Sequence, residues 1–117
     1  MAATLPKSER LCGKTAIAGL MDCGKAGTAG CLRYKYLPQE QADATRILVS
    51  VPKRSFKRAV KRNLLKRRIR ESYRLQKQLL HSPVDVMFIY LPREMLPFAD
   101  IYASMTAALT AIGENLA

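Results

Sequence analysis

Eleven Lys and Arg side chains lie between residues 53 and 74, and they are the residues of this chain best suited to chemistry. The segment reads KRSFKRAVKRNLLKRRIRESYR and holds one acid, Glu71, so it carries +10 of the chain's net charge of +11. Arginine offers a planar fork that binds phosphate through two hydrogen bonds, and lysine offers a point charge. Such dense positive charge opposes compaction unless a polyanion neutralises it. The segment therefore predicts a phosphate-binding surface.

The commonest role of charged side chains is to solvate a helix, but the composition of this segment argues against that role. Solvated helices place Glu four residues from Lys, and the segment contains only Glu71. Like charges one turn apart destabilise a helix by about 0.2–0.5 kcal/mol per pair. We interpret the segment as binding nucleic acid. A basic zipper is disfavoured because no heptad seam follows, and a membrane-surface helix because bulky anchors such as Trp are missing.

Residue types that catalyse reactions or bind metals are sparse. His81 is the single histidine, and the acids are too scattered to form a carboxylate pair or a nucleophile–base set. Asp85, at the start of a predicted strand, is expected on the surface. Cys12, Cys23 and Cys31 lack the spacing of a zinc site, which favours reduced thiols. We expect no catalytic residue and no metal ligand in this chain.

The size of the chain predicts one domain over residues 1–117, with residues 1–13 as an irregular N-terminal arm. A hydrophobic content of 49% is typical of globular proteins. No apolar run is long enough to span a membrane, and MAATLPKSERL lacks the apolar centre of a secretion signal. These features predict a cytoplasmic protein without a membrane partner.

Periodicity predicts the elements that precede the basic segment. A short helix is expected over residues 16–22, followed by a flexible glycine-rich turn over 24–30. Strict alternation predicts strands over 32–37 and 46–51. We expect these two strands to pair as an antiparallel hairpin.

A long helix is predicted next, over residues 56–80, with Ser55 as its N-cap and Pro83 beyond its end. An apolar central strand is expected over 84–90, and a helix with one core-facing stripe over 99–116. Projection of the long helix at 100° per residue gives it three sides. The core side holds Leu65, Ile69, Tyr73, Gln76 and Leu80; the second side holds Asn63, Lys66, Arg67, Arg70 and Arg74; the third holds Lys57, Lys61, Leu64 and Arg68.

Residues 51–71 resemble the signature of the bacterial ribonuclease P protein subunit. In that family a strand ending in Val-x-Lys-Lys/Arg is followed by Ala-Val-x-Arg-Asn-Arg-x-Lys-Arg-x-x-Arg-Glu. The matching positions here are Val51, Lys53, Arg54, Ala59, Val60, Arg62, Asn63, Lys66, Arg67, Arg70 and Glu71. One position departs from the pattern, because Leu64 replaces the second Arg of Arg-Asn-Arg. We interpret this as lineage drift offset by Lys61 and Arg68.

The resemblance implies an α+β fold like the second domain of ribosomal protein S5. This fold is a small single domain with a mixed sheet, a short N-terminal helix, a long basic helix in a left-handed βαβ crossover, and a C-terminal helix packed on the sheet. It further implies a subunit of an endoribonuclease that removes the 5′ leader from precursor tRNA. The chemistry would belong to the RNA subunit, which would hold the required Mg²⁺. The implied partners are the catalytic RNA and precursor tRNA, with no obligate protein partner.

The resemblance also implies two RNA-binding surfaces. Residues expected to bind the catalytic RNA are Lys53, Arg54, Lys57, Arg58, Lys61, Arg62, Asn63, Lys66, Arg67, Arg70 and Arg74. A cleft between the first helix and the sheet would bind the leader, through residues drawn from Ile17, Met21, Arg33, Tyr34, Lys35 and Tyr36. A one-residue shift of register decides whether the first strand turns its tyrosines or its two cations to this cleft, and the sequence leaves both alternatives open.

Two other functions stay open on sequence alone. One is a non-catalytic, ribosomal-type RNA-binding protein with a purely structural role. The other is an autonomous enzyme that uses one of the cysteines as a thiol nucleophile, although no residue spacing supports it.

Overall fold

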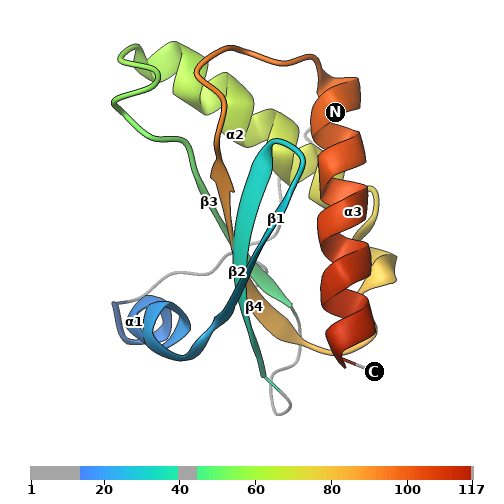
Figure 1. Ribbon diagram of the computed structural model, residues 1–117. Coiled ribbons are helices and arrows are strands. Elements are labelled where there is room, and N and C mark those ends of the chain that lie inside the picture. Colours follow the sequence, from blue (N-terminus) through green and yellow to red (C-terminus); the bar gives the residue numbers. More distant parts are fainter. Residues whose placement is uncertain (1–13, 40–44, 117) are drawn as a thin grey trace.

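The computed structural model describes residues 14–39 and 45–116, so the predicted N-terminal arm lies outside the described residues. The elements in chain order are α1 (Lys14–Cys23), β1 (Lys25–Ala29), β2 (Leu32–Pro38), β3 (Arg46–Ser50), α2 (Ala59–Arg74), the short 3-10 helix η2 (Lys77–Leu79), β4 (Val84–Tyr90) and α3 (Phe98–Leu116). They form the α+β domain that the sequence predicts (Figure 1). Within the described ranges, every helix is too short or too polar to cross a membrane.

Four strands form one mixed sheet in the order β1-β2-β4-β3. β1 and β4 both pair with β2 in antiparallel fashion, whereas β3 is parallel to β4. Because α2 joins β3 to its parallel neighbour, β3–α2–β4 is a βαβ unit. The predicted hairpin between β2 and β3 is wrong, because β4 lies between these strands. β4 is nearly all buried, and a strand buried on both faces takes an inner position.

The sheet has one strand that the glycine-rich sequence of residues 24–30 does not predict. β1 reads KAGTA, and its small residues have low strand propensity. It forms because it pairs with β2. In this pairing Gly27 lies opposite Tyr34, and a Cβ at Gly27 would lie only 2.4 Å from the Tyr34 hydroxyl. The tyrosine ring thus takes the space that a side chain at Gly27 would fill. Gly30, with a φ of 55°, opens the two-residue turn between the strands, which favours glycine at that position.

The helices cover the two faces of the sheet unequally. One face packs against α2 and α3, and its core includes Tyr36, Phe88, Ile69 and Met105. The other face packs against α1, mainly through Leu20 and Met87. Figure 1 shows α1 and α3 on opposite sides of the sheet. The longer helices therefore bury most of the apolar surface, and α1 leaves part of the opposite face of the sheet uncovered.

The long basic helix is shorter at both ends than predicted. Ser55 does not cap the helix, because it lies in the preceding turn, where the Ser55 amide donates a hydrogen bond to the Pro52 carbonyl. Phe56 is instead buried against the ring of Tyr90, with 5.9 Å between the ring centroids. The helix can begin only after this anchor, at Ala59.

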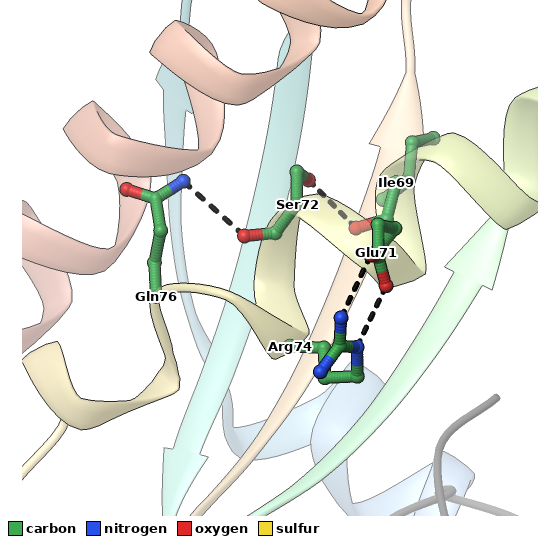
Figure 2. A network of polar contacts seen from close by, with 5 residues as sticks. All are labelled: Ile69, Glu71, Ser72, Arg74 and Gln76. Carbon is green, nitrogen blue, oxygen red and sulfur yellow. Dashed lines mark hydrogen bonds and ion pairs between the residues drawn. The ribbon is translucent and has the colours of Figure 1, made fainter. Parts of the chain in front are cut away.

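At its C-terminal end, α2 gives way to a turn that is fixed by the buried side chain of Gln76. The Gln76 amide donates hydrogen bonds to the carbonyls of Ser72 and Tyr102, each 3.2 Å long. Figure 2 shows the bond to Ser72 beside the ion pair of Arg74 and Glu71. Since Tyr102 belongs to α3, Gln76 joins the end of α2 to the C-terminal helix.

The expectation that Asp85 lies on the surface is wrong. Asp85 is only 1% exposed, and its two carboxylate oxygens accept hydrogen bonds of 3.0 and 2.8 Å from Nε and Nη2 of Arg46. The two residues are direct partners in the parallel β3–β4 register, so their side chains share one face. Sequence spacing does not reveal the pair because 39 positions separate its members.

Replacement of Asp85 by Asn should destabilise the fold. The change keeps the shape of the side chain but removes the charge that Arg46 faces, and we expect the free energy of unfolding to fall by about 1–3 kcal/mol. Urea denaturation measures this as a lower midpoint at unchanged m-value. Glu114→Gln is the matched control, since it removes an exposed acid from α3 and should change stability by less than about 0.5 kcal/mol. Equal midpoints for the two variants would show that the buried pair contributes nothing.

Candidate nucleic-acid interface

The outward side of α2 concentrates positive charge. Leu65, Ile69 and Tyr73 turn inward and are almost fully buried, which confirms these three members of the predicted core side. The other two lie beyond the end of α2, where Gln76 is buried and Leu80 half-buried. Of the predicted RNA-binding residues, Lys53, Arg54, Lys57, Arg58, Lys61, Asn63 and Arg67 are exposed, and Arg62, Lys66, Arg70 and Arg74 are half-buried. The first turn contains no acid and no capping side chain. The positive end of the helix dipole therefore adds to the field of the side chains.

The hydrogen bonds of Arg62, Arg68 and Arg74 join these three arginines of α2 to other groups of the protein. Arg62 donates hydrogen bonds of 2.7 and 2.9 Å to the carbonyls of Phe56 and Lys57, so it holds the segment that precedes the helix. Arg68 donates one of 3.0 Å to the Leu96 carbonyl. These contacts give Arg62 and Arg68 a structural role besides their charge.

The third of these arginines, Arg74, forms an ion pair with Glu71. Two hydrogen bonds of 2.7 and 2.8 Å join the guanidinium to the carboxylate (Figure 2). The hydrogen bonds from Arg74 lower the pKa of the Glu71 carboxyl, which stays charged at neutral pH. The single acid of the basic segment thus lies against Arg74, and the N-terminal half of α2 keeps its full positive charge.

A pocket of 410 Å³ beside the start of α2 adds a cation that sequence analysis missed. Its lining residues are Ser55, Phe56, Lys57, Arg58, Lys61, Arg93, Glu94 and Met95. Arg93 comes from the loop between β4 and α3, far from the basic segment in sequence. No signal in the sequence points to Arg93, because residues 92–94 (PRE) form an ordinary loop tripeptide. Only the folded chain brings Arg93 next to α2.

Tyr90 holds the loop that carries Arg93. Its hydroxyl donates a hydrogen bond of 2.6 Å to the Glu94 carbonyl and accepts one of 2.9 Å from the Leu96 amide. Burial raises the pKa of Tyr90 above its ordinary value, although the hydrogen bond from the Leu96 amide opposes this. Tyr90 and Arg68 together fix the loop against α2.

The register of β2 decides which side chains face α1. Tyr34 and Tyr36 are buried in the core shared with α2 and α3, and their ring centroids lie 6.2 Å apart. Arg33 is exposed and Lys35 half-buried, on the alternate face. The cations of the strand therefore take the α1 side and its tyrosines the core side, although Tyr34 also borders the pocket on the α1 side.

A pocket of 300 Å³ lies on the α1 side of the sheet. Its lining residues are Met21, Ala26, Arg33, Tyr34, Lys35, Met87 and Ile89. The ammonium of Lys35 donates a hydrogen bond to the Met21 carbonyl, which ties β2 to the last turn of α1. Ile17 packs against the Leu20–Met87 cluster instead of lining the pocket. Of the predicted leader-binding residues, the structure thus brings four together in this lining: Met21, Arg33, Tyr34 and Lys35.

Chemically reactive groups contribute little to either surface. Among the described residues, no group of three or more His, Cys, Asp and Glu side chains lies close enough to hold a metal ion. Cys23 is exposed and Cys31 is buried, while Cys12 lies outside the described residues. Both surfaces are suited to binding anions.

Comparisons with known proteins agree with this architecture. The family model described as Ribonuclease P matches residues 5–113. A ribonuclease P protein component from Porphyromonas gingivalis is 36% identical over 121 residues, covering 96% of this chain and 88% of that protein. The RNase P protein of Staphylococcus aureus has a TM-score of 0.79 at 22% identity, covering 91% of this chain and 96% of that chain. The Thermotoga maritima protein has a TM-score of 0.76 at 21% identity, covering 88% and 96%.

The two structural likenesses show that this is the small α+β fold of the bacterial RNase P proteins. The chain belongs to the family of ribonuclease P protein components, which takes part in tRNA processing.

Replacement of Tyr90 by Phe tests the anchor of the Arg93 loop. Loss of the hydroxyl leaves the Glu94 carbonyl and Leu96 amide without their partner, so the free energy of unfolding should fall by about 1–2 kcal/mol. The raised pKa of Tyr90 makes a second contribution to the free energy of unfolding. This contribution is complete below the pKa of tyrosine in the unfolded chain, about 10, and is lost as pH rises through the pKa of Tyr90 in the folded protein. Wild type should thus lose stability above about pH 10, and Tyr90→Phe should lose less.

The matched control is Tyr102→Phe, because the Tyr102 side chain is exposed and its ring contact with Phe98 survives the change. Denaturant unfolding between neutral and alkaline pH gives both comparisons. Parallel pH curves for wild type and Tyr90→Phe would contradict the role of Tyr90.

Proposed function

We propose that the chain is the RNA-binding subunit of ribonuclease P, and that it docks on the catalytic RNA through the N-terminal half of α2 and the segment before it. The observation that carries this proposal is the charge of +10 within residues 53–74. The segment before α2 and the exposed side of the helix offer six exposed cations: Lys53, Arg54, Lys57, Arg58, Lys61 and Arg67. A rigid helix with this pattern can follow the phosphates of a folded RNA.

The positive surface also explains what the protein would add to an RNA enzyme. A folded RNA concentrates phosphates, and Mg²⁺ is the usual means of reducing their repulsion. Protein cations at the same phosphates reduce the Mg²⁺ concentration that folding and substrate binding require. We propose that the RNA performs the hydrolysis and holds Mg²⁺, because the surface of α2 repels divalent cations.

The pocket on the α1 side is the proposed site for the 5′ leader of precursor tRNA. Arg33 and Lys35 supply positive charge for the leader phosphates, and Met21 and Ile89 supply apolar contact for base faces. Single-stranded nucleic acids bind surfaces that combine such features. With no exposed aromatic ring in the pocket, base contact would be apolar packing without ring stacking. The proposed partners are therefore the catalytic RNA and precursor tRNA, in the cytoplasm where tRNA is processed.

Reconstitution tests the proposal. The protein alone should not cleave precursor tRNA, whereas protein with the cognate RNA should cleave at a lower Mg²⁺ concentration than the RNA alone. The gain in substrate affinity should be larger for precursor tRNA with a leader than for tRNA without one. An unchanged Mg²⁺ requirement together with unchanged substrate affinity would refute the proposal and favour a structural, ribosomal-type role. Cleavage without any RNA would point to an autonomous enzyme.

Two adjacent arginines form a matched pair for testing the docking surface. Arg67→Ala removes an exposed charge, so binding to the catalytic RNA should weaken and the salt slope should fall by about 0.7–0.9 units. Its free energy of unfolding should change by less than about 0.5 kcal/mol. Arg68→Ala removes the bond to the Leu96 carbonyl and should lower the free energy of unfolding by about 0.5–1.5 kcal/mol.

Filter binding at several salt concentrations gives the slopes, and urea denaturation gives the stabilities. A wild-type slope for Arg67→Ala would place the RNA surface elsewhere on the protein.

A further inference from the structure

The outer side of α2 carries a shallow pocket that phosphate binding alone does not explain. The pocket has a volume of 320 Å³ and is lined by Val60, Asn63, Leu64 and Arg67. These residues follow the spacing i, i+3, i+4, i+7, so they form one stripe on the helix. The volume lies at the lower end of the range of about 300–1,000 Å³ that is typical of small-ligand sites.

Two of the four residues that line the pocket are apolar, although the helix around them is cationic. Val60 is 78% exposed and Leu64 is 37% exposed. A single exposed apolar residue is ordinary on a protein surface. Two of them one turn apart, between an amide and a guanidinium, form a defined patch. Neither belongs to the buried clusters of the core, so packing within the protein does not explain their position.

The surrounding charge restricts what can cover this patch. Lys61 and Arg67 are exposed next to it, and the first turn of α2 contains no acid. An occupant must therefore carry negative charge and also present an apolar face. An unpaired nucleobase between its two phosphates has both properties, because the ring faces are apolar and the phosphates are anionic.

The polar residues of the pocket favour a nucleobase over an acidic peptide. Asn63 presents a hydrogen-bond donor and an acceptor side by side, which matches the edge of a base. The Arg67 guanidinium can bind a phosphate through two hydrogen bonds or lie flat against a base. A peptide backbone can also pair with the Asn63 amide, but an acidic peptide lacks a flat ring face next to a phosphate, which the apolar side chains and Arg67 together suit.

We propose that Val60, Asn63, Leu64 and Arg67 bind one unpaired nucleobase of the RNA that docks on α2. The base lies on the methyl groups of Val60 and Leu64, Asn63 binds its edge, and Arg67 binds an adjacent phosphate. This inference rests on the proposed docking of the catalytic RNA and adds a site of defined chemistry to it. Leu64, which replaces an arginine of the family pattern, thus exchanges a phosphate contact for a base contact.

The site gives RNA binding two separable components. Phosphate contacts release counterions and weaken as salt rises. Contact between a base and an apolar floor involves no charge, so its contribution is the same at every salt concentration. Loss of Val60 and Leu64 should therefore lower affinity and leave the salt slope unchanged, whereas loss of Arg67 should lower both affinity and the salt slope.

The test uses the full chain with Val60→Ala and Leu64→Ala combined. Both changes shorten exposed side chains in favour of a good helix former, so the fold should persist. Affinity for the cognate RNA should fall about tenfold, the loss that removal of one base contact worth roughly 1.4 kcal/mol produces. The salt slope should equal that of wild type. Chemical probing of the bound RNA should show one unpaired nucleotide that wild type protects and the double variant exposes.

Leu75→Ala is the matched control, because Leu75 is a 43% exposed leucine just beyond the end of α2 and outside the pocket. It should bind like wild type and protect the same nucleotide. Equal affinity of wild type and the double variant, with identical protection, would overturn the inference in favour of a protein partner for the patch. A lower salt slope in the double variant would overturn it as well. Failure of wild type to bind the RNA would instead refute the proposed function.

Discussion

Mutual repulsion of the cations on α2 is the constraint on which the rest of the fold depends. α2 itself carries six of the ten net positive charges of residues 53–74, and each pair of like charges one turn apart opposes the helical conformation. Burial of Leu65, Ile69 and Tyr73 against the sheet supplies the opposing free energy. The apolar side of α2 therefore keeps its charged side in place, and most helical stability in proteins comes from such packing.

The remaining polar contacts hold this helix without neutralising its exposed charge. Arg62 and Arg68 donate their hydrogen bonds to backbone carbonyls, so both keep their positive charge. Glu71 is the only acid within α2 itself, and it lies in the C-terminal half of the helix against Arg74. The N-terminal half thus remains strongly positive next to the Arg93 loop. The fold separates an anion-binding end of the helix from an end that is tied to α3 by Gln76.

Local patterns in the sequence were sufficient to predict most elements. Alternation predicts β2 and β3 almost to the residue, an apolar run predicts β4, and apolar spacing predicts α3 and the core side of α2. What the sequence could not show depends on residues far apart in the chain. The Arg46–Asp85 pair requires the parallel register, and Arg93 reaches α2 through a loop that Tyr90 holds. β1 is the local exception, because its small residues have low strand propensity and it forms by pairing with β2. Which face of the sheet carries Arg33 is determined only when Tyr34 and Tyr36 pack into the core on the other face.

The inner position of β4 has a consequence for synthesis of the chain on the ribosome. β4 pairs with both β2 and β3, yet it follows them and the whole of α2 in the sequence. A nascent chain that ends before Val84 can form the β1–β2 hairpin, but β3 has no strand to pair with. The basic helix then emerges before the surface that covers its apolar side is complete. Folding of this domain must therefore wait for its last third, during which the unpaired strand edges are open to aggregation.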